Sequence, residues 1–77
     1  MIVQSRTFKI PGKFTINLTP KDPSETFDVM FDIPNEKIFY YNNEKQTQIF
    51  YVTTGDSIVI DLLRGNIDIF AAFDPIP

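Results

Sequence analysis

The chain has 77 residues, enough for one small domain that buries only about 60–65% of its unfolded surface. It contains no cysteine and no histidine, which excludes disulfides and the usual zinc and copper sites as sources of stability. The net charge is −3 without a cluster of Lys and Arg, so phosphate neutralisation, and with it nucleic-acid binding, is not expected.

The first half of the chain is predicted to form three strands separated by proline-containing turns. The first strand spans residues 3–10 and ends at the turn signal Pro11-Gly12. The second (13–19) and the third (26–33) alternate between apolar and polar residues, as strands with one buried face do. The segment 20–25 between them is predicted to be a loop, because its two prolines cannot donate ladder hydrogen bonds.

Four further strands are predicted in the second half, at residues 37–41, 47–53, 57–63 and 67–73. The polar segment 42–46 is typical of a hairpin loop. Gly65-Asn66 is predicted to be a tight turn of the two-residue hairpin kind, since both residues tolerate positive φ. Seven strands and no convincing helix predict one all-β domain over residues 1–77, a compact antiparallel β-sandwich or a partly closed barrel.

The strands of the second half are unusual because they are apolar on both faces. One small core can cover one face, so the other face needs a second sheet or another subunit. We take the core face to be Ile38, Tyr40, Ile49, Tyr51, Ile58, Ile60, Ile67 and Ile69, although inside and outside can be exchanged strand by strand. We then predict that the opposite face is an interface, made by Phe39, Tyr41, Phe50, Val52, Val59, Leu63 and Phe70. The alternative is a bent barrel that buries both sets.

The candidate catalytic residues do not form a recognisable constellation. The serines have no histidine to activate them as nucleophiles. Asp28 and Asp32 share one face of a predicted strand, but their spacing along it is about 13 Å. A glycosidase pair requires a separation of about 5–10 Å, so we do not expect an enzyme.

Two polar loops, 22–25 and 54–57, could offer oxygen ligands to calcium. A dedicated calcium loop needs six to eight oxygens and repeats Asp or Asn at alternate positions, and neither loop does so. Turn formation by Asp is the preferred interpretation, and no metal or other cofactor is predicted.

Aromatic residues on neighbouring strands could also form a ligand platform. Tyr40, Tyr41 and Tyr51 are the candidates for a carbohydrate site, which would not need the basic groove that nucleic acid requires. Packing in a core or an interface is the favoured interpretation of these aromatics.

The N-terminal residues lack the pattern of a signal peptide, and no apolar run approaches the roughly 18 residues of a membrane span. We therefore expect cytoplasmic synthesis and no membrane partner. The favoured function is a structural module that forms a homo-oligomer or docks on a larger protein assembly. The setting we expect is a viral (phage) particle, as a capsid decoration, head-fibre or tail component. The alternatives are a small carbohydrate-binding β-module and a small inhibitor or regulator that docks by a sheet edge.

Overall fold

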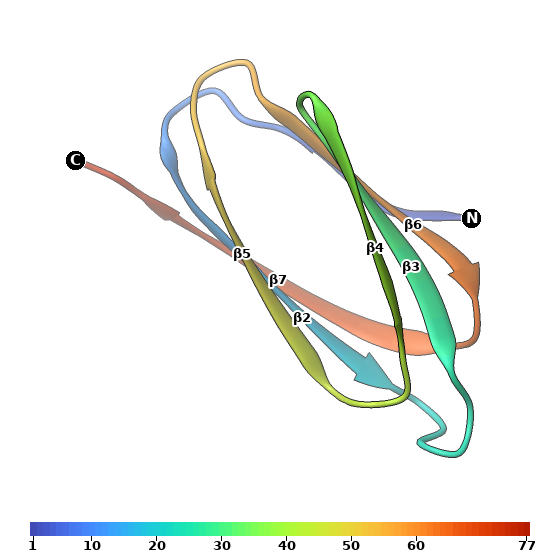
Figure 1. Cartoon of the computed structure of the whole chain (residues 1–77). Coiled ribbons are helices and arrows are strands. Elements are labelled where there is room, and N and C mark those ends of the chain that lie inside the picture. The colour runs from blue at the N-terminus through green and yellow to red at the C-terminus, as the bar shows by residue number, and fades with distance from the viewer.

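The computed structural model describes residues 1–77 and is all-β, with seven antiparallel strands and no helix (Figure 1). The strands are β1 (Ile2–Thr7), β2 (Gly12–Pro20), β3 (Phe27–Ile33), β4 (Glu36–Asn42), β5 (Gln46–Val52), β6 (Ser57–Arg64) and β7 (Ile67–Pro75). All seven predicted strands are confirmed, with shifts only at their ends. The largest shift is in β1, which ends at Thr7 rather than at residue 10.

The strands form two sheets that face each other as the layers of a sandwich (Figure 1). One sheet has four strands in the order β1-β6-β3-β4, and the other has three in the order β5-β2-β7. No strand pairs with a strand of the other sheet, so the sandwich alternative of the prediction is confirmed. Five of the six connections cross from one sheet to the other, and only β3 and β4 form a hairpin between consecutive strands.

The predicted hairpins in the second half are therefore wrong as pairings. The loop between β4 and β5 and the turn at Gly65-Asn66 both join strands of different sheets. A reversal of chain direction has the same local sequence signature whether the next strand pairs beside the previous one or packs across from it. Gly65 has the expected positive φ, 89°, but its turn connects strands of two different sheets.

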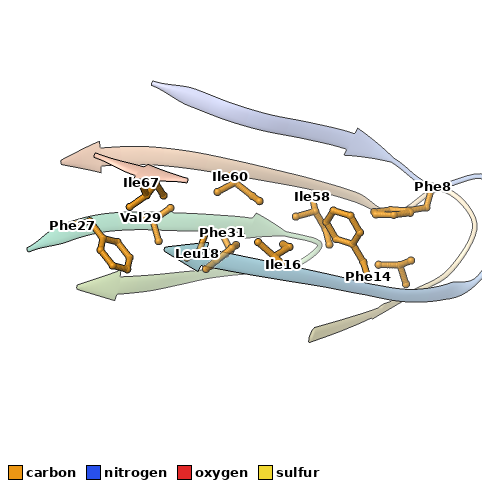
Figure 2. Close-up of a cluster of buried hydrophobic side chains, with 11 residues drawn as sticks. Phe8, Phe14, Ile16, Leu18, Phe27, Val29, Phe31, Ile58, Ile60 and Ile67 are labelled. Atoms are coloured by element: carbon orange, nitrogen blue, oxygen red, sulfur yellow. The ribbon is translucent and has the colours of Figure 1, made fainter. Parts of the chain in front are cut away.

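The core lies between the two sheets and is entirely apolar (Figure 2). The alternation in β2 and β3 is confirmed, since every second side chain of each strand points into this layer. The eleven buried side chains are Phe8, Phe14, Ile16, Leu18, Phe27, Val29, Phe31, Val52, Ile58, Ile60 and Ile67. No polar or charged residue is buried, so hydrophobic burial stabilises the interior without any buried polar network.

The inside and outside of β5 are opposite to the prediction. Phe50 packs against the core and Val52 belongs to it, whereas Ile49 and Tyr51 point outward. The run Ile-Phe-Tyr-Val contains no polar residue that could indicate the phase. Pairing with β2 determines it, because Phe50 lies opposite the fully buried Phe14 and cross-strand neighbours share a face.

Candidate functional site

Large apolar side chains are exposed on the outer surfaces of all four strands of the second half. A single exposed apolar residue is ordinary on a protein surface, but a concentration of them indicates an interaction site. The exposed fractions are 61% for Phe39, 65% for Tyr41, 48% for Ile49, 74% for Tyr51, 49% for Leu63 and 67% for Phe70. The central strands β2 and β3 instead present mainly Lys, Thr, Asn and Asp outward.

The seven residues of the predicted interface do not form one surface. Phe39, Tyr41, Val59 and Leu63 belong to the four-stranded sheet. Three of them, Phe39, Tyr41 and Val59, pair with outward residues of β3 and therefore lie on the outer face of this sheet. Phe70 lies on the outer face of the three-stranded sheet, on the opposite side of the molecule. Phe50 and Val52 do not lie on the predicted outer face, because the register of β5 turns both toward the core.

The outer face of the four-stranded sheet mixes apolar and charged side chains. Phe39 lies opposite Met30, and Asp61 lies on the far side of Met30. The next row places Tyr41 and Arg64 on either side of Asp28. Asp28 and Asp32 share this face, as the alternation predicts, but each lies across from a basic residue, Arg64 and Lys37 respectively. Interspersed charge divides the apolar surface of this face into small areas.

The outer face of the three-stranded sheet has two apolar borders around a polar centre. Ile49 and Tyr51 of β5 form one border, and Phe70 and Ala72 of β7 form the other. The outward residues of β2 between them are Lys13, Thr15, Asn17 and Thr19. The Thr47 hydroxyl donates a 2.6 Å hydrogen bond to the Oδ1 atom of Asn17, so this acceptor of the polar centre already has a partner within the chain. Sequence reasoning missed Ile49 and Tyr51 on this face, because nothing in their own strand indicates its phase.

Most of the exposed apolar side chains lie on strands at the edges of the sheets. The edge strands are β1 and β4 in one sheet and β5 and β7 in the other. Phe39, Tyr41, Ile49, Tyr51 and Phe70 all belong to β4, β5 or β7. Contact between molecules at such an edge can bury apolar side chains and unpaired backbone groups together.

The three tyrosines of the predicted carbohydrate platform are separated by the fold. Tyr41 and Tyr51 lie on opposite outer faces, and Tyr40 packs against the core. Tyr41 alone borders a polar depression of about 340 Å³, which Glu25, Thr26, Arg64 and Gly65 complete. The platform that motivated the carbohydrate alternative is therefore not assembled.

The two loops considered for calcium are held by turns of their own. The Ser24 hydroxyl and amide both donate to the Oδ1 atom of Asp22, at 2.7 and 2.9 Å, and lower the pKa of this carboxyl from its ordinary value of 3.8. The amide of Thr53 donates to the Oδ2 atom of Asp56 at 2.9 Å. The structure brings together no group of three or more potential metal-ligating side chains.

Comparison of the chain with protein-family models, curated proteins and solved structures returned no match. The structure also contains no helix that is long and apolar enough to cross a membrane. The outward apolar side chains of the edge strands form the candidate functional surface.

Proposed function

We propose that this chain is a non-enzymatic assembly module, which self-associates or docks on a partner protein through the outward apolar side chains of β4 to β7. The exposure of four aromatic residues carries this proposal. Phe39, Tyr41, Tyr51 and Phe70 are each more than 60% exposed in a chain of 77 residues. Aromatic residues are enriched in the buried centres of protein interfaces, where they supply much of the binding energy.

Burial of these side chains would provide a substantial driving force. Full burial of a Phe side chain stabilises by roughly 1.5–3 kcal/mol, so a few aromatic residues can support association. The domain itself is small, and chains of this size often gain the stability that they lack from oligomerisation. The excess of acidic residues in the second half keeps unassembled copies apart until they meet in the correct geometry.

The setting that we propose is a multi-copy assembly such as a viral particle, with this chain as a capsid decoration, head-fibre or tail component. Such a particle repeats one contact many times by symmetry, so a modest interface on each copy suffices. A small β-sandwich with apolar side chains at its edges is suited to this use. This part of the proposal rests on fold type and not on a sequence motif.

Sedimentation equilibrium of the purified chain over a range of concentrations tests the proposal. We expect a reversible oligomer, and at least one of the variants Phe39→Asp and Phe70→Asp should shift it toward the monomer while circular dichroism stays that of a folded β-protein. Ser5→Asp is the matched control, because it adds the same charge at an exposed position of the edge strand β1, where the side chain is polar. It should leave the association unchanged.

A chain that stays monomeric at the highest attainable concentration, and that captures no partner protein from a lysate of the cells that produce it, contradicts the proposal. That outcome would direct attention to the polar depression beside Tyr41 as a ligand site.

A further inference from the structure

The longest unpaired sheet edge in the molecule belongs to β7. The strand pairs with β2 along its whole length, from Ile67 to Pro75, and nothing pairs with its other side. Two hydrogen bonds show which residues face β2: the amide of Lys21 donates to the Asn66 carbonyl, and the amide of Ile76 donates to the Pro11 carbonyl.

Backbone groups in an antiparallel strand alternate in direction, and the register between β2 and β7 is unbroken. Even-numbered residues of β7 therefore bond to β2, and odd-numbered residues direct their backbone groups away from it. The unpaired amide donors on this edge are those of Ile67, Ile69, Ala71 and Phe73, since Pro75 has no N–H.

Other edges of the sandwich carry devices that oppose pairing over much of their length, whereas in β7 the charges of Asp68 and Asp74 lie on the outer face of the sheet and Pro75 is the last residue of the strand. Edge β1 contains a bulge between Ile2 and Gln4, and the guanidinium of Arg6 turns over the aromatic rings at the open side of the core. Edge β4 begins with the charged pair Glu36-Lys37. Bulges, turned-in charges and edge lysines are the usual protection against strand addition. The edge β5 is uncharged, but it has only seven residues, against nine in β7.

We propose that β7 pairs antiparallel with β7 of a second copy, so that the two three-stranded sheets join into one sheet of six strands. The proposal rests on the self-association proposed above and specifies its geometry. In the register that we assign, Phe70 lies opposite Phe70 of the second copy, on the twofold axis between the copies. Each of the four unpaired donors then meets a carbonyl of the other strand, because odd-numbered residues face odd-numbered ones.

The charge pattern of β7 selects this register among its neighbours. With Phe70 on the axis, Asp68 lies opposite Ala72 and Asp74 lies opposite Asn66, so no like charges meet. A shift that places Ala71 on the axis would set Asp68 opposite Asp74 twice, which is unfavourable. Shifts that centre the pair on Ile69 or Ala72 would set Phe70 opposite an aspartate and leave fewer donors paired.

The selected register also pairs the one large apolar side chain of β7 that is exposed. Phe70 is 67% exposed, and it belongs to the residues whose backbone does not bond across the new edge. Such non-hydrogen-bonded pairs bring Cα atoms to about 4.5 Å and side chains closest together. An aromatic pair there contributes beyond its area burial. The twofold pairing is isologous, so it closes into a dimer and does not extend into a fibre.

Engineered cysteines test the pairing directly, because the chain has none of its own. The double variant Asp68→Cys/Ala72→Cys keeps Phe70 and places each cysteine opposite its counterpart in the second copy. A Cα separation of about 4.5 Å lies within disulfide geometry. Within one chain the two positions are four residues apart, about 13 Å, and cannot bond. Under mild oxidation we expect the double variant to become a covalent dimer on a non-reducing gel.

Single-cysteine variants and a control at another outward-facing position show whether the cross-linking depends on the proposed register. Asp68→Cys and Ala72→Cys alone should cross-link no faster than Tyr51→Cys, which lies on the other edge of the same sheet, but mixing the two singles should restore the dimer. Rapid cross-linking of Ala71→Cys alone, with none of the double variant, would overturn the register. If the wild-type chain is oligomeric by sedimentation but the double variant cross-links no faster than the control, the proposed edge pairing is wrong. The proposed self-association is then unaffected.

A proline substitution tests the unpaired donors without introducing a cross-link. Ala71→Pro removes an amide that the isolated domain does not use, so the variant should fold and its dimer dissociation constant should rise at least tenfold. Ala72→Pro is the matched control, because it removes a donor bonded to β2 and should unfold the domain. If Ala71→Pro folds and dimerises like the wild type, pairing through this edge is wrong, whereas a monomeric wild type would refute the proposed self-association itself.

Discussion

Gly65 lies directly against the backbone of Phe27, where the chain turns from β6 in one sheet to β7 in the other. A Cβ atom added to Gly65 would lie 2.8 Å from the Cα atom of Phe27 and 3.0 Å from the carbonyl oxygen of Thr26. Gly65 also has a φ of 89°, a conformation that side chains disfavour. Neither constraint can be relieved by moving a flexible side chain.

The first prediction is that Gly65→Ala destabilises the domain far more than Gly55→Ala. Gly55 has nearly the same φ, 91°, but open space around the position of an added Cβ. Its substitution should cost roughly 1 kcal/mol from backbone strain alone. Gly65→Ala adds a steric clash that should cost roughly 1–3 kcal/mol more. Urea unfolding measures both variants, and equal destabilisation would contradict the close contact with Phe27.

Two neighbouring residues of β5 should respond oppositely to the same substitution. Phe50 packs against Phe31 with a ring-centroid distance of 5.6 Å, whereas Tyr51 is 74% exposed. Phe50→Asp loses this packing and brings a charge to the core, at a cost of roughly 3–5 kcal/mol, comparable with the whole stability of a small domain. We expect Phe50→Asp to be unfolded and Tyr51→Asp to be folded by circular dichroism. The reverse result would show that the inside of β5 has been assigned incorrectly.

The guanidinium of Arg6 should stabilise the open side of the core by contact with aromatic faces. Its Cζ atom lies 5.2 Å from the ring centre of Phe8, 5.6 Å from that of Phe14 and 5.1 Å from that of Phe73. Arg6 is exposed, so we expect Arg6→Gln to reduce the free energy of unfolding by roughly 0.5–1 kcal/mol. Arg6→Lys retains the charge and should recover only part of the loss, because an ammonium group cannot stack on a ring. Thermal unfolding of both variants distinguishes stacking from charge alone.

The hydrogen bonds to Asp22 predict how the stability of its turn changes with pH. The hydrogen bonds from Ser24 lower the pKa of Asp22 in the folded chain below its ordinary value of 3.8. The turn is therefore stabilised at pH values above 3.8, and this stabilisation is lost as the pH falls through the lower pKa of the folded chain. Ser24→Ala removes the hydroxyl donor and should raise the pKa of Asp22 toward 3.8. An NMR titration of the Asp22 carboxyl carbon measures the shift. An unchanged titration midpoint would mean that the hydroxyl does not hold the carboxylate in solution.

Alternation made the central strands predictable. In β2 and β3 the polar residues lie outward between apolar neighbours, most of which are buried, so a period of two identifies both the strand and its inner face. The same signal is absent from β5, where Ile49 to Val52 are all apolar, and there the prediction of the inner face was wrong. For this reason the predicted interface included Phe50 and Val52, which face the core. Its remaining members were also dispersed over two opposite faces, which spacing along the chain cannot reveal.

Local sequence is sufficient to determine that this chain forms seven strands, because extended conformation, turn residues and a period of two are properties of neighbouring residues. The tertiary structure decides which strands pair, since a loop such as 42–46 permits either a hairpin or a crossing to the other sheet. Packing of one sheet on the other, through contacts between residues far apart in the chain, selects the crossing in five of six connections. The same selection leaves β7 at an edge, and so determines where its apolar residues and unpaired amides are exposed.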